Sequence, residues 1–129
     1  MALIGTLQQG ILKHILGLAA WTEPTGLTLA LFTTAPSVPG GTGGVEVSGG
    51  SYARQAISFA VTGTGPAQAA NGALISFPVA TANWGTIVAM GVYDNNGNLV
   101  DVGTLTASKT INNGDQFTVP ASDYTIDLT

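Results

Sequence analysis

The sequence predicts a mainly β protein, an antiparallel β-sandwich or jelly roll with one N-terminal α-helix. From residue 27 onward, short β-rich runs alternate with turn signals, which is typical of sandwiches and small barrels. Before that point, apolar residues recur at helical spacing instead. The 129 residues are the size of one domain. We expect residues 1–20 to carry the helix and residues 27–129 to form the sandwich.

Residues 2–18 are expected to form an amphipathic helix. Four apolar residues recur at intervals of four: Leu3, Leu7, Ile11 and Ile15. Three glycines within this stretch weaken a helix by up to roughly 1 kcal/mol each. Such a helix must be held by packing, either on its own sheet or on a neighbouring subunit. His14, the chain's one histidine, is expected at the surface or at a boundary.

The remaining elements follow from alternation and turn chemistry. Residues 27–34 are mostly apolar and are expected to form a central strand. Further strands are expected at residues 56–62, 73–78, 86–94, 99–106, 110–111, 116–119 and 124–128. Turns rich in Gly, Asn, Asp or Pro are expected at residues 63–66, 94–98 and 112–115. Trp84 is expected in the core or at its boundary.

A glycine-rich loop at residues 37–52 contains six glycines and a possible short edge strand at Val45–Val47. Loops of this length are typically functional or disordered, so it is either a flexible tip or an arm that orders on a partner. Arg54 follows it and has two interpretations. It forms an ion pair or carbonyl clamp that pins the loop to the sheet edge, or it binds a partner's carboxylate in bidentate fashion. The candidate partner contacts are Glu46, Ser51, Tyr52 and Arg54.

The composition excludes several classes of protein. Charged residues make up 8% of the chain, against about a quarter in typical domains. An uncharged polar surface favours a protein that works packed against other subunits. The net charge of −4 and three widely separated basic residues argue against nucleic acid as a partner. The absence of cysteine excludes disulfides and thiol chemistry. No apolar run approaches the roughly 20 residues of a membrane span.

No pattern of residues predicts catalysis, a cofactor or a metal. Asp94, Asn96, Asn98 and Asp101 resemble a calcium loop, but the spacing suits a hairpin equally well and the terminal glutamate is missing. His14 alone would have to serve any catalytic triad, and the glycines form no phosphate-binding fingerprint. The sequence therefore predicts a non-enzymatic protein without cofactors.

Five segments carry a family resemblance: LTLALFTTAP (27–36), GGVEVSGGSYARQ (43–55), ISFPVATANWGTI (75–87), GVYD (91–94) and ASKTINNGDQF (107–117). In this order they resemble a family of small tailed-bacteriophage virion proteins, often labelled tail fibre or structural proteins. The resemblance covers nearly the whole chain. It implies a virion protein assembled in the host cytoplasm, and it implies no catalytic residues.

Within a virion, the shape predicted for this chain favours a capsid decoration (cement) protein. A small β-rich domain, a marginal apolar helix and a long glycine-rich loop suit a homo-oligomer, expected to be a trimer, that bridges capsomers and contacts the major capsid protein. The alternative is a tail fibre or tail adaptor component. A third hypothesis is a carbohydrate-binding or depolymerising module, against which the sparse carboxylates argue.

Overall fold

The computed structural model describes residues 2–63 and 67–128. Its elements, in chain order, are β1 (Ala2–Leu3), α1 (Gly5–Ile15), β2 (Thr28–Thr34), β3 (Val45–Glu46), β4 (Gln55–Ala56), β5 (Phe59–Thr62), β6 (Ala67–Asn71), β7 (Ile75–Ser76), β8 (Gly85–Tyr93), β9 (Leu99–Ile111), β10 (Thr118–Val119) and β11 (Thr125–Leu128). The mainly β class with an N-terminal helix is confirmed.

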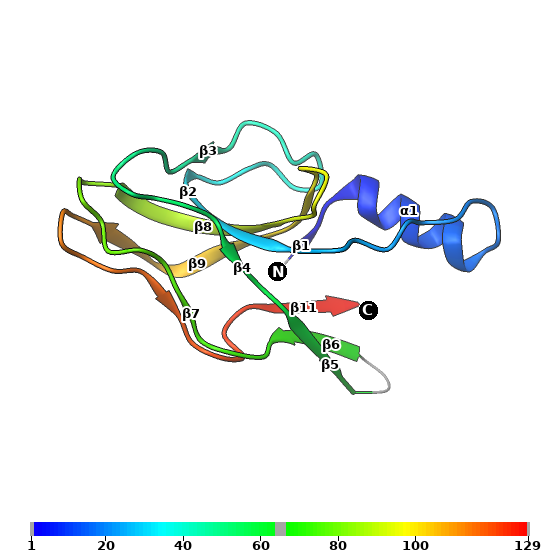
Figure 1. Ribbon diagram of the computed structural model, residues 1–129. Helices are drawn as coiled ribbons and strands as arrows, with labels where there is room; N and C mark the ends of the chain where they lie inside the picture. The colour runs from blue at the N-terminus through cyan, green and yellow to red at the C-terminus, as the bar shows by residue number, and fades with distance from the viewer. Residues whose placement is uncertain (1, 64–66, 129) are drawn as a thin grey trace.

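The strands form three antiparallel sheets. The largest has the order β1-β9-β8-β2-β3, and β4 pairs with β2 on the same edge as β3. A second sheet has the order β11-β6-β5, and β10 pairs with β7 in a third. Figure 1 shows the large sheet as one layer and the smaller sheets as a second layer below it.

Strand β2 is the centre of the packing, as its apolar sequence predicts. Leu29 and Leu31 point into the main core between the layers, where Phe77 and Tyr124 of the lower layer are also buried. Ala30 and Phe32 belong to a smaller cluster on the opposite face of the sheet. Because residues 29–32 are covered on both faces of the sheet, none of these positions favours a polar side chain, which explains why this stretch is entirely apolar.

The N-terminal helix is shorter than the predicted residues 2–18, and it does not fill residues 1–20. Ala2 and Leu3 pair with Val102 and Asp101 on β9, and the side chain of Ile4 is buried. These contacts stabilise an extended entry to the helix more than two extra helical residues would. At the other end, Gly17 adopts a φ of +72°, the left-handed conformation that commonly terminates helices.

Three of the later strand predictions need correction. The predicted strand at residues 56–62 is divided between β4 and β5, which belong to different sheets. The strands predicted at residues 99–106 and 110–111 are one strand, β9. Strand β6 was not predicted, because its sequence AQAAN has little intrinsic β preference and is fixed by pairing with β5 and β11. Residues 64–66 of the predicted 63–66 turn lie outside the described residues.

Candidate functional site

The segment from β3 to β4 runs along one edge of β2 in two pieces. Strand β3 pairs near Phe32, β4 pairs at Thr28 and Leu29, and the chain between them leaves the sheet. Leu31 lies opposite this gap. Its carbonyl accepts a hydrogen bond from the Val47 amide at 3.0 Å, and its own amide donates to the Tyr52 hydroxyl at 3.0 Å. A tyrosine side chain thus replaces the backbone acceptor that a continuous strand would supply.

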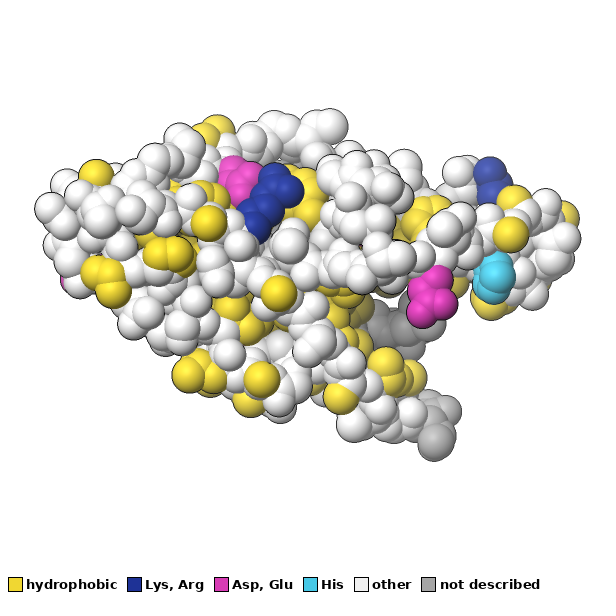
Figure 2. Space-filling view, in the orientation of Figure 1, with side chains coloured by type: hydrophobic (Ala, Val, Ile, Leu, Met, Phe, Trp, Pro, Cys, Tyr) yellow, Lys and Arg dark blue, Asp and Glu magenta, His cyan; other side chains and the backbone are white. Residues whose placement is uncertain are grey.

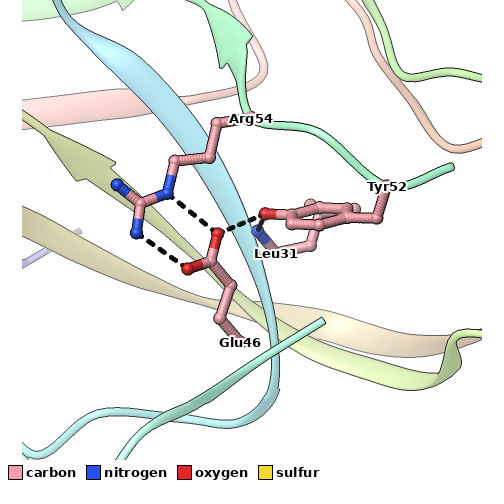
Figure 3. Close-up of polar contacts among 4 residues, drawn as sticks. All are labelled: Leu31, Glu46, Tyr52 and Arg54. Atoms are coloured by element: carbon pink, nitrogen blue, oxygen red, sulfur yellow. Dashed lines mark hydrogen bonds and ion pairs between the residues drawn. The ribbon is translucent and has the colours of Figure 1, made fainter. Parts of the chain in front are cut away.

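Glu46 is the centre of the polar contacts at this edge. Arg54 donates to both carboxylate oxygens, from Nε at 2.9 Å and from a terminal nitrogen at 2.8 Å, and the Tyr52 hydroxyl donates to Oε2 at 2.6 Å. Figure 3 shows Arg54 and Tyr52 converging on Glu46 beside Leu31. The Arg54 guanidinium also lies 3.8 Å from the centroid of the Tyr93 ring. The ion pair that pins the loop to the sheet edge, one of the two interpretations of Arg54, is therefore present.

The contacts fix the charge state of this Glu46 cluster (Glu46, Tyr52 and Arg54). Burial alone would raise the pKa of Glu46, but the hydrogen bonds from Arg54 and Tyr52, together with the arginine charge, outweigh it and lower the pKa. The hydrogen bond to Glu46 raises the pKa of Arg54. Burial and the hydrogen bond to Glu46 raise the pKa of Tyr52. At neutral pH the cluster is a charged pair and a protonated phenol.

Ser51 and the preceding glycine fasten the rest of the loop. The Ser51 hydroxyl lies 2.9 Å from that of Thr81, and the Trp84 indole donates to the Gly50 carbonyl at 2.9 Å. Gly50 has a φ of +58°, and a Cβ there would lie 2.9 Å from the Trp84 nitrogen, so this close approach requires glycine. Trp84 is buried, as predicted, and meets the Tyr52 ring edge-on. All four candidate contact residues thus lie in one segment, residues 46–54, that these contacts hold to the rest of the protein. We call it the fastened segment.

The helix and the chain that returns from it form an N-terminal arm, residues 5–22, that projects beyond the end of the sheets (Figure 1). Trp21 packs directly on Gly10, where an added Cβ would come within 1.9 Å of its ring. His14 is exposed, as predicted, and accepts a hydrogen bond from the Trp21 amide at 3.2 Å. The sequence predicts that the helix packs either on its own sheet or on a neighbouring subunit. The helix does not cover its own sheet (Figure 1).

The turn that resembles a calcium loop does not gather its oxygens around a cation position. Asp94 accepts hydrogen bonds from the amides of Asn96 and Asn98 and so closes its own turn. Asp101 is buried elsewhere, against Tyr124. Within residues 2–63 and 67–128, no three acidic or histidine side chains are grouped to hold a metal. No helix in the described chain is long and apolar enough to cross a bilayer.

Comparison with known families decides the identity. Residues 2–127 match the family described as podophage GP4 fiber I protein gp80. The chain belongs to this family. No curated protein matches the chain.

As a fiber I family protein, the chain is a structural component of a phage virion and not an enzyme. The resemblance to small virion proteins is confirmed by this match. The family favours the tail fibre alternative over the capsid cement hypothesis, for which it gives no support.

Two polar residues of this fibre protein are buried although the sequence does not predict it. Asn71 and Asp101 are 1% and 0% exposed. Asn71 precedes a glycine, which indicates only a turn, and a carboxylate such as that of Asp101 is ordinarily expected on the solvent-exposed face of a strand. Their roles depend on segments distant in sequence, and no local signal identifies them.

Replacing Glu46 by glutamine in the fibre protein should lower the free energy of unfolding by about 1 kcal/mol at pH 7. The glutamine still accepts from Tyr52, but the charged pair with Arg54 is lost. Because the pKa of Glu46 is lowered by folding, its contribution is present above about pH 4.5 and disappears as the pH falls through the folded-state pKa. Urea titrations at pH 7 and at a series of lower pH values down to 2.5 follow the loss of this contribution. The exposed Glu23→Gln control should leave the free energy of unfolding unchanged, and a Glu46→Gln effect that is the same over the whole pH series would contradict the ion-pair account.

Proposed function

We propose that this chain is a subunit of the podophage tail fibre, and that it acts as a connecting piece instead of a shaft. The observation that carries the proposal is the match to a fibre protein family over residues 2–127. The low charge of the chain supports a working life spent in contact with other subunits. Its two layers of strands suit a compact junction (Figure 1), since an elongated shaft would be expected to be built from repeated units.

The subunit is proposed to work as a homo-oligomer, with a trimer as the expected state, that also contacts other virion proteins. The projecting arm supports an assembly role, because it holds large apolar side chains in solvent. Figure 2 shows hydrophobic side chains at the surface of this arm. The Glu46 cluster and Ser51 are proposed as a second contact region, with the fastened segment presenting a preorganised surface to a partner.

Virions assembled without this chain test the proposal. A fibre subunit should be dispensable for the head, so the mutant particles should contain DNA, survive heating like wild-type particles and fail to adsorb to host cells. Supplying the chain from a plasmid should restore adsorption. Heads that lose DNA or fracture when the chain is missing would support the cement hypothesis and contradict the fibre proposal.

A further inference from the structure

The arm exposes an apolar stripe on the helix and the turn that follows it. Leu12, Ile15, Leu16 and Leu18 are 56%, 67%, 67% and 74% exposed. Together they present on the order of 500 Å² of apolar surface, more than half of the roughly 800 Å² that each partner contributes to a standard interface. Leu12, Ile15 and Leu16 stand at i, i+3 and i+4, the spacing with which a helix anchors in a groove.

The rest of the chain outside the arm, here called the body, carries a groove that can receive these apolar side chains. Between Ala89 and Ile87, β8 advances by two residues while β9 advances from Thr104 to Lys109, so the extra residues of β9 form a bulge in this stretch. The bulge borders a groove of about 320 Å³ with apolar residues in its lining, among them Met90 and Phe117. A cavity of about 150 Å³ holds one benzene, so the groove has room for two side chains of leucine size.

Charge selects the body of a second copy over its arm as the docking surface. Lys13 is the one charged residue of the arm, and with a chain total of −4 the rest of the chain carries five net negative charges. Two arms brought together would place like charges side by side, whereas an arm on a body pairs opposite net charges. At the groove itself, the negative charge of Asp123 is matched by the positive charge of Lys109. The groove lining therefore carries no net charge and accepts a weakly basic helix.

Geometry excludes insertion of an arm into its own groove. The arm leaves the body beside Leu3, which pairs with Asp101 near the start of β9, and it points away from the sheets (Figure 1). The groove lies along the later part of β9 and beside β10. The arm and the groove are therefore different surfaces at opposite ends of the molecule, as a head-to-tail contact requires.

We infer that the apolar stripe of one copy docks into the β9–β10 groove of the next copy, which links subunits head to tail. This inference deepens the proposed function by naming the partner of the arm. A head-to-tail contact closes into a ring when its rotation permits, and a trimer is the smallest ring that gives each subunit two different neighbours.

Two complementary variants of the full chain test the inference. The first carries Leu12→Gln, Ile15→Gln and Leu16→Gln, all at exposed arm positions, and keeps its groove intact. The second carries Ala107→Arg, at an exposed position of the groove lining, and keeps its arm. Leu74→Gln and Ala60→Arg, at exposed positions outside the arm and the groove lining, are the matched controls. Circular dichroism checks that each variant folds, and sedimentation velocity gives its mass.

The wild-type chain and both controls should sediment as multiples of 13.0 kDa. For each variant alone, the dissociation constant of self-association should rise by about 30-fold or more, and the protein should sediment as a monomer. An equimolar mixture should form a dimer and nothing larger, because one intact arm meets one intact groove. A monomeric wild type, a mixture that stays monomeric, or controls that also dissociate would overturn the inference. The fibre proposal would survive any of these results if the chain still fractionates with tails.

Discussion

Replacing Asn71 by alanine is expected to lower the free energy of unfolding by about 4 kcal/mol, a large part of the roughly 5–15 kcal/mol typical of a domain. The Asn71 side chain is buried and makes three hydrogen bonds. Its amide donates to the carbonyls of Ala73 and Pro120 at 3.0 and 2.9 Å, and its Oδ1 accepts from the Tyr124 amide at 2.9 Å. Alanine would leave the buried Tyr124 amide without its partner, at a cost of about 1–3 kcal/mol, and would remove the bonds to the partly buried carbonyls of Ala73 and Pro120, at about 0.5–1.5 kcal/mol each.

The effect should be large because Asn71 joins the end of β6 to the turn that precedes β11. Its backbone also pairs there, with Tyr124 and with the Ser122 amide, so the side chain completes a local network that fixes Tyr124 in the core. Urea denaturation followed by circular dichroism measures the change. Asn96→Ala, in an exposed turn, is the control and should cost less than about 0.5 kcal/mol. A loss below about 1 kcal/mol for the Asn71 variant would contradict this account.

Replacing Asp101 by asparagine is expected to remove most of the chain's pH dependence of stability between pH 4 and pH 7. The Asp101 carboxyl is fully buried; Oδ2 accepts from the Tyr124 hydroxyl at 2.8 Å, and Oδ1 has no hydrogen-bond partner within the described residues. Burial raises the pKa of Asp101 to about 6, although the hydrogen bond from Tyr124 opposes this shift. Compared with the unfolded chain, the folded state therefore favours the protonated form of the Asp101 carboxyl.

The sign follows from this raised pKa. The unfolded chain ionises Asp101 near its ordinary pKa of 3.8, and the folded chain does so near 6. The free energy of unfolding should thus fall by about 2 kcal/mol as the pH rises from 4 to 7, and then level off. Asparagine cannot ionise, so the variant should be nearly flat over this range and more stable than wild type at pH 7 by about 1 kcal/mol.

Urea midpoints at half-unit pH steps measure this profile. Asp123→Asn, an exposed aspartate, is the control and should retain the wild-type slope. The contribution of Glu46 changes below about pH 4.5 and has the opposite sign, so the range from pH 5 to pH 7 isolates Asp101. A variant that keeps the wild-type slope in that range would show that another group titrates there.

Local patterns in the sequence predicted the parts of the fold that depend on local chemistry. The mostly apolar residues 27–34 predict a central strand, and this is β2, in which residues 29–32 are buried. The turn residues at 94–98 predict the hairpin that Asp94 closes. For Arg54 the sequence left open an ion pair or carbonyl clamp at the loop and a contact with a partner's carboxylate; the structure shows an ion pair with Glu46, a residue that the sequence did not identify as its counterpart.

Other features depend on contacts between distant segments and could not be predicted. The entry to the helix is extended because Ala2 and Leu3 pair with a strand about 100 residues later. The direction of the arm depends on where β1 joins the sheet, and no helical pattern specifies that. Asn71 acquires its role from Pro120 and Tyr124, some 50 residues away. In each case tertiary pairing decides a conformation that local preference leaves open.

If this chain is a tail fibre subunit, it should be located with the tails of intact virions. Purified particles would be separated into heads and tails, and the 13.0 kDa chain would be quantified in each fraction by mass spectrometry against the major capsid protein. We expect the chain in the tail fraction, in a small number of copies per particle. Recovery with the heads, in numbers comparable to the capsid protein, would contradict it.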